Sequence, residues 1–213
     1  MDNLSKRKVA LRTSLAGIAA IGGLFAYNSV SAQSENAATS FSATLSALPN
    51  TSGSGKASLR LSADRKTLLV HITARGLEAG GQHVSHIHGL SSGGQPVNST
   101  CPTLAQDTDR DTFVELDEGL ATYGPILIDF MNIDPNQDGV IDFRTTIRLT
   151  GSEGILPLAD REIVVHGMSV GAVGAGTPGE VDGTAGYKTV LPVLCGAIVA
   201  TGTKEDPLKF RTR

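Results

Sequence analysis

Three of the chain's five histidines fall within the short segment HVSHIHG, residues 83–89. Side chains alternate between the two faces of a β-strand, so His86 and His88 would project from one face and His83 from the other. Neutral imidazoles are good ligands for zinc and copper, but two of them hold an ion weakly. His166 ends the β-branched run REIVVH and is the candidate for a third ligand. The pattern favours a metal site made of His86, His88 and His166.

One acidic segment, DTDRDTFVELDE (residues 107–118), follows the twelve-residue template of calcium-binding loops. Thr112 stands at position six, where the template has a glycine that permits a sharp turn. A solvated acidic loop explains the same residues without an ion, so both interpretations stay open. The candidate ligands are the carboxylates at positions one, three, five, nine and twelve, namely Asp107, Asp109, Asp111, Glu115 and Glu118.

A second acidic segment, DPNQDGVIDFRT (residues 134–145), has the glycine that the first lacks but departs from the template at its last position. Asp134, Asn136 and Asp138 match the template, and Gly139 fits position six, but Thr145 replaces the closing glutamate. A turn built on Asp-Pro-Asn and Asp-Gly explains this segment without an ion. Neither acidic segment lies between two convincing helices, so we do not expect a pair of EF-hands.

The elements that must position these residues are strands. Alternating or β-branched segments separated by Gly, Pro, Asn, Asp and Ser recur along the chain, which has 25 glycines and no tryptophan. The sequence predicts an all-β Greek-key sandwich or barrel of about eight strands over residues 41–202, with one short helix near residues 115–123. His71 falls among the outward-facing residues of its segment, so we expect a surface histidine.

The first 32 residues are typical of a secretory signal, with a basic start, a small apolar stretch and the cleavage pattern Val30-Ser31-Ala32. A transmembrane anchor is the rival interpretation, but the apolar run is short and interrupted by glycines. We therefore expect a secreted or periplasmic protein, with a flexible lead-in at residues 33–40 and a charged tail at residues 203–213.

Charge and cysteine content narrow the class of protein further. Removing residues 1–32 takes away four basic residues and one acid, which moves the net charge from −3 to about −6. Such a chain has no basic stripe for nucleic acid. Cys101 and Cys195 are the only cysteines, and a single pair in an exported protein predicts one disulfide, with two free buried thiols as the alternative.

The segments HVSHIHG, LADREIVVHG and LCGAI, in this order and spacing, resemble the copper/zinc superoxide dismutase family over about residues 55–199. The resemblance implies that His86, His88 and His166 are copper ligands and that His83 braces the site from behind the strand. It also implies the family disulfide between the two cysteines. The residue pattern of SHIHG also resembles chordin-type (CHRD) modules.

The sequence departs from that family in residues that matter for catalysis. No histidine occurs between Cys101 and His166, so the ligand that bridges copper and zinc is absent, and so are the family's zinc ligands. Pro192 stands where the family has an arginine that guides superoxide, and a positive group near the metal speeds the capture of an anion. Met168 could offer a sulfur ligand to Cu(I) but is more typical of packing.

Three functions follow as hypotheses. The first is an exported copper-binding domain with weak or no dismutase turnover. The second is a metal-free interaction or structural module that kept the sandwich. The third is a zinc hydratase or hydrolase that uses the same three imidazoles with a bound water. The copper hypothesis accounts for the most residues at once and is our prediction, with calcium as a further possible ion.

Overall fold

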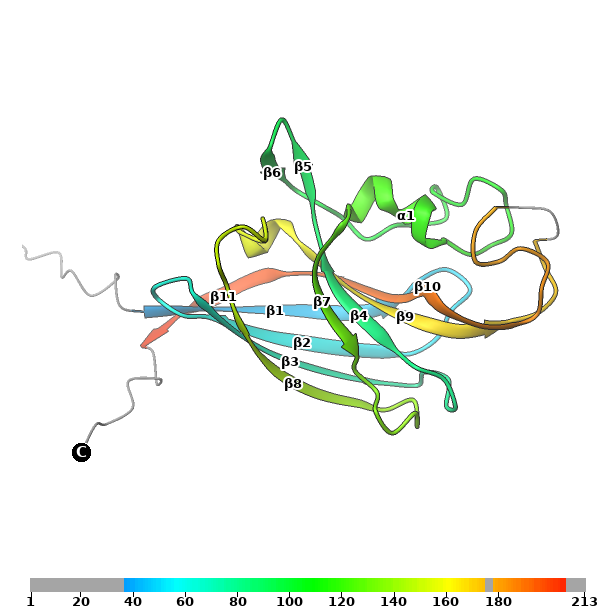
Figure 1. Ribbon diagram of the computed structural model, residues 1–213, viewed down its shortest axis with the longest axis horizontal. Helices are drawn as coiled ribbons and strands as arrows, with labels where there is room; N and C mark the ends of the chain where they lie inside the picture. Colours follow the sequence, from blue (N-terminus) through cyan, green and yellow to red (C-terminus); the bar gives the residue numbers. More distant parts are fainter. Residues whose placement is uncertain (1–36, 175–177, 206–213) are drawn as a thin grey trace, which may run out of the picture. The chain divides into compact units, whose positions relative to one another are not determined.

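The structure is a computed structural model that describes residues 37–174 and 178–205. This part of the chain is all-β with a single α-helix, which confirms the predicted fold class (Figure 1). The expected signal segment 1–32 and the greater part of the expected tail lie outside the described residues. Among the residues that are described, no helix has the length and apolar character needed to cross a membrane.

Eleven strands and two short helices make up the described chain. They are β1 (Ala37–Ala47), β2 (Ser54–Leu61), β3 (Thr67–Arg75), β4 (Val84–His88), β5 (Leu90–Ser92), β6 (Gln95–Val97), α1 (Leu116–Tyr123), β7 (Ile126–Asn132), β8 (Ile141–Arg148), the 3-10 helix η1 (Leu158–Asp160), β9 (Glu162–Val170), β10 (Gly186–Ala197) and β11 (Val199–Glu205).

One curled antiparallel sheet contains all the strands except the small β5–β6 hairpin. Its order is β7-β4-β9-β10-β1-β2-β3-β8, and β11 pairs with β1 beside this path. Several neighbours, such as β3 and β8, are far apart in the chain, so the connections cross between the two halves as in Greek-key folds. In Figure 1 strands β4 and β7 cross in front of the layer formed by β1, β2, β3 and β8. Among the described strands, no pairing joins β7 to β8, and the sheet therefore stays open between them.

The core lies between the two halves of the curled sheet. The alternation of Leu68, Val70 and Ile72 along β3 gives a buried face, and each of these residues is at most 3% exposed. Ile87 of β4 and Phe130 of β7 belong to the same hydrophobic cluster from the opposite half. Because successive side chains along a strand point to opposite faces, burial of Ile87 against this core turns His86 and His88 to the other face of β4.

That other face is covered by the long connection between β6 and β7, which contains α1. Tyr123, the last residue of α1, is fully buried with Val164 of β9 and Cys195 of β10. Cys101, in the same connection, forms the predicted disulfide with Cys195, with a Cα–Cα distance of 5.7 Å. The disulfide therefore fastens this connection over the face that carries the histidines.

The strands differ from those predicted from the sequence in three places. Strand β1 begins at Ala37 and takes in half of the expected lead-in, residues 37–40, because residues 37–42 find a partner in β11. The predicted last strand is divided at Ile198 into β10 and β11, which pair with different parts of the same edge of β1, because β2 occupies the other edge. The β5–β6 hairpin was not predicted, since each of its strands has only three residues.

Candidate metal centre

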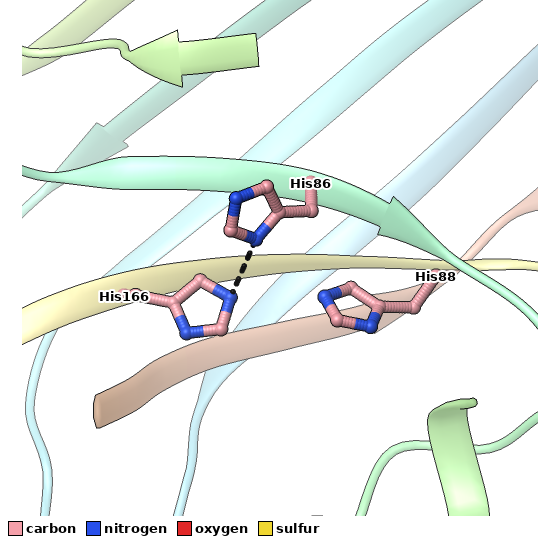
Figure 2. A group of neighbouring side chains, drawn as sticks. All are labelled: His86, His88 and His166. Carbon is pink, nitrogen blue, oxygen red and sulfur yellow. Dashed lines mark hydrogen bonds between the residues drawn. The ribbon is translucent and has the colours of Figure 1, made fainter. Parts of the chain in front are cut away.

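His86, His88 and His166 meet in one cluster, as the sequence predicts. β4 carries the first two, and His166 lies on the adjacent antiparallel strand β9. One ring nitrogen from each histidine lies within 4.8 Å of the others. Figure 2 shows the three rings turned toward one another, with the contact between His86 Nδ1 and His166 Nε2 at 3.1 Å. His88 and His166 are fully buried and His86 is 7% exposed.

The outer nitrogens of two rings are held by backbone carbonyls. His88 Nδ1 donates to the carbonyl of Gly124 at 2.8 Å, and His166 Nδ1 donates to that of Val190 at 2.7 Å. A carbonyl only accepts, so each Nδ1 carries the proton and each Nε2 presents its lone pair to the cluster. His88 Nε2 is buried and has no hydrogen-bond partner. Leaving such a group unpaired costs about 1–3 kcal/mol.

Hydrogen bonds cannot satisfy both ring nitrogens of His86 when the ring is neutral. His86 Nδ1 faces the lone pair of His166 Nε2, and His86 Nε2 lies 3.4 Å from Asp129 Oδ1. Neutral imidazole has one proton, so either tautomer leaves two acceptors facing each other. A cation between the three rings removes the conflict, because His86 Nε2–H can then donate to Asp129 while three lone pairs bind the ion. The donor set therefore fits a metal ion.

All three imidazoles stay neutral near pH 7. Burial lowers the pKa of His86, against the opposing effect of the Asp129 carboxylate. Burial lowers the pKa of His88 to about 4. Burial, together with the other two histidines, lowers the pKa of His166 well below its usual value. Neutral imidazole is the form that binds a metal.

His83 lies on the opposite side of the strand from the cluster, as its position predicts. Its Nδ1 is 3.1 Å from the backbone carbonyl of His166, and its Nε2 is 2.9 Å from that of Glu78. The ring is fully buried. It therefore contacts the backbone that carries a candidate ligand and does not touch the cluster of rings.

Three other residues singled out in the sequence are not part of the cluster. Pro192 pairs with His166 across β10 and β9. Met168 packs against the hydrophobic clusters. His71 is half-buried, and its Nε2 lies 2.8 Å from Asp142 Oδ1 on β8.

The disulfide contacts a buried acid that the sequence did not single out. Glu162 is 1% exposed, and its Oε2 lies 3.3 Å from Cys101 Sγ and 4.0 Å from Cys195 Sγ. These three side chains could hold a metal if the thiols were free, but the sulfurs are bonded to each other. A disulfide sulfur has no proton to donate, so burial without a donor raises the pKa of Glu162 to about 8.

The acidic loop 107–118 adopts the backbone pattern of a calcium loop. Thr112 has φ +81°, the conformation that a glycine would provide, and its N–H donates to Asp107 Oδ2 at 3.0 Å. Phe113 N–H donates to Asp111 Oδ1 at 2.8 Å. Thr112 thus serves at position six despite its side chain, and Asp107 and Asp111 face into the loop.

Five carboxylates converge in this loop. Oxygens of Asp107, Asp109 and Glu118 lie within 4.8 Å of one another, and so do those of Asp109, Asp111 and Glu115. Asp109 Oδ2 and Asp111 Oδ2 are buried without a hydrogen-bond partner. Burial raises the pKa of Asp111, and burial likewise raises that of Glu115 to about 7, while neighbouring carboxylates add to both shifts. This arrangement of acids suits a divalent cation with oxygen ligands.

Sequence reasoning missed three parts of the histidine site. Asp129 stands in the segment ILIDF and gave no metal-ligand spacing, and the carbonyls of Gly124 and Val190 have no sequence signal at all. The Asp-Phe end of a strand next to the histidine strand could have suggested Asp129, but only with the β4–β7 pairing known.

No known protein family matches this chain, and no curated protein is similar enough to count as a match.

Proposed function

We propose that this chain is an exported, superoxide-dismutase-like domain that holds one copper ion through His86, His88 and His166. The observation that carries the proposal is the buried His88 Nε2, which has no partner and lies beside two other imidazole nitrogens. Bound copper would supply one-electron redox chemistry. The chain's own residues orient three neutral rings and exclude water from them.

The donor set favours copper over the zinc hydratase. Three imidazoles and no anionic ligand bind copper more tightly than zinc at equal geometry. A zinc hydratase also needs a water and a substrate at an open coordination position. His88 and His166 are fully buried, which leaves little room for either.

The rim of the site opposes fast turnover of superoxide. The carboxylate of Asp129 lies 3.4 Å from His86 Nε2, and this negative side chain is about half exposed. Superoxide is an anion, and a carboxylate at this position repels it, whereas a metal cation is attracted. Weak or absent dismutase turnover, with firm retention of copper, is the expected behaviour.

Metal loading tests the proposal. The chain is purified after export into an oxidising compartment, stripped with a chelator, loaded with Cu²⁺ or with Zn²⁺, and freed of excess ion by gel filtration. Copper per chain is then measured by plasma emission spectrometry. We expect stoichiometric copper in the wild type and in the control variant His71→Gln. His88→Gln and His166→Gln should lose it while keeping the wild-type circular dichroism spectrum.

The alternatives predict other results. Stoichiometric zinc with little copper would favour the hydratase. No retained ion of either kind would leave the metal-free module. If copper is bound, superoxide consumption by the loaded protein should be slow and should rise in Asp129→Asn, because that variant loses the repelling charge.

We infer that the loop 107–118 binds calcium as a separate, structural site. The supporting observation is the pair of buried, unpartnered oxygens on Asp109 and Asp111 within a group of carboxylates. Within the described residues, no ion pair joins these acids to a lysine, arginine or histidine. A divalent cation would offset their mutual repulsion and fix the start of α1, where Glu115 and Glu118 form a capping box.

Thermal unfolding tests this second proposal. Calcium should raise the melting temperature of the wild type, and Asp109→Asn combined with Asp111→Asn should remove most of that rise. Asp117→Asn is the matched control, because Asp117 is exposed in the first turn of α1 and lies outside the cluster. Indifference of the wild type to calcium and chelator would exclude the site.

A further inference from the structure

We propose that the connection between β7 and β8, residues 133–140, is a second calcium site, and that the ion there fastens the open side of the sheet. This inference is independent of the histidine cluster and of the loop 107–118. It rests on the carboxylate of Asp134, which is fully buried and has one oxygen, Oδ1, without any hydrogen-bond partner.

The other oxygen of Asp134 is bound by the backbone of the turn. Gly139 N–H donates to Asp134 Oδ2 at 2.9 Å, across the turn. The next residue, Val140, donates its N–H to Asp138 Oδ1 at 3.0 Å. Two successive N–H groups thus bind the two carboxylates of this turn, the buried Asp134 and the exposed Asp138. Asp134 Oδ1, on a carboxylate fixed in this way, stays buried without a donor in a turn that carries a second carboxylate.

The backbone follows the same course as in the first acidic loop. Gly139 has φ +74° at position six, and Gln137 has φ +55° at position four. Thr112 and Arg110 hold the equivalent positions of the first loop with φ of +81° and +67°. The template then places the backbone carbonyl of Val140 and the side chain of Asn136 among the oxygen ligands, with Asp134 and Asp138.

A buried carboxylate oxygen with no donor is costly, and no described basic side chain forms an ion pair with Asp134. A divalent cation is the ligand that this arrangement suits, because it pairs with oxygen alone and tolerates water at the remaining positions. Calcium fits better than magnesium, since irregular loops of carboxylate, amide and carbonyl oxygens meet its flexible geometry. With Thr145 at the closing position, binding in about the 0.1–1 mM range is expected, as for extracellular modules.

The position of residues 133–140 between β7 and β8 indicates what a bound ion would do there. β7 and β8 are consecutive in the chain but stand at opposite ends of the sheet order. The turn crosses the gap between them and contacts the β3–β4 connection, where Gly80 N–H donates to the carbonyl of Gln137 at 2.8 Å. An ion that joins Asp134, after β7, to Val140, before β8, would tie the two ends of the sheet together.

Hydrogen–deuterium exchange of the full mature chain, resolved by peptide, tests the proposal with calcium alone as the probe. Calcium at about 1 mM should slow exchange in the peptide that covers residues 133–141 several-fold relative to chelated protein. Asp134→Asn should abolish this protection and leave the response of the peptide covering residues 107–118 unchanged. Asp142→Asn is the control, because Asp142 contacts His71 and Arg144 on the outside of β8 and should not alter the protection.

Each outcome decides the matter. Unchanged exchange of the 133–141 peptide in the wild type on adding calcium overturns the proposal, whatever the first loop does. Persistent protection in Asp134→Asn overturns it as well. If Asp134→Asn does not fold, Asp138→Asn takes its place, since Asp138 is exposed and its exchange for asparagine keeps an acceptor for Val140 N–H. Loss of protection in that variant supports the site, and retention refutes it.

Discussion

Replacing Glu162 by glutamine should change how the stability of the protein depends on pH. The carboxyl of Glu162 has a pKa of about 8 in the folded protein against 4.5 as the ordinary value, because burial disfavours its charged form. A raised pKa means that the folded state holds the proton more tightly than the unfolded state. The stabilising contribution is therefore complete below pH 4.5 and is lost as the pH rises from 4.5 to about 8.

The size of the effect follows from the same values. Each unit of pKa difference corresponds to about 1.4 kcal/mol, so ionisation of Glu162 should lower the free energy of unfolding by an amount on the order of 5 kcal/mol at alkaline pH. Glu162→Gln does not ionise. Its free energy of unfolding should fall less steeply than that of the wild type across the window, and the difference should become constant above about pH 8.

Urea unfolding of chelated protein at a series of pH values measures this difference. Glu153→Gln is the control, because hydrogen bonds from Thr150 lower the pKa of Glu153 to about 2, so this carboxyl is ionised throughout the window. Its curve should run parallel to the wild type. Parallel curves for Glu162→Gln and wild type would refute the reasoning, whereas a constant offset between them would not, since an amide can pack differently at every pH.

Two further predictions concern the connection that covers the histidines. Serine at both Cys101 and Cys195 should lower the free energy of unfolding by about 4 to 5 kcal/mol, because the disulfide spans a sequence separation of 94. Denaturant unfolding measures it, and an unchanged midpoint would contradict the loop-entropy estimate. Gly119→Ala should lower the melting temperature, although alanine normally gains about 1 kcal/mol within a helix. The added Cβ would overlap the ring of Tyr123, whereas Gly171→Ala meets open space and should be nearly neutral. A melting temperature that rises in Gly119→Ala would refute this packing argument.

The strands could be predicted from local alternation, and the pairing of distant strands could not. Leu68, Val70 and Ile72 recur at every second position, which indicates a half-buried strand whatever its neighbours are. Nothing in the sequence near β3 indicates that β8 lies beside it, because the pairing depends on contacts across about seventy residues. The division between β10 and β11 at Ile198 was missed for the same reason.

The histidine cluster was predictable because parity along a strand is a local property. His86 and His88 must share a face, and His83 must take the other. The direction in which the nitrogens of His88 and His166 point depends on the carbonyls of Gly124 and Val190, which are far from these histidines in the sequence. Burial of Glu162 was equally hidden, since a glutamate at the first position of a strand more often faces solvent.

The gap between β7 and β8 also bears on whether copies of this protein associate through their sheet edges. Among the described strands, none pairs with the outer edge of β7 or of β8, and such a row of unpaired backbone N–H and C=O groups lets sheets join edge to edge and aggregate. On β8 the exposed positions include Asp142, Arg144 and Arg148, and charged side chains along an edge discourage a neutral strand from docking. On β7 the positive φ of Met131 and the irregular register opposite β4 leave the edge bent. The two ends of the sheet are therefore protected by different means, charge on one and distortion on the other, and the protein can keep an open sheet in solution.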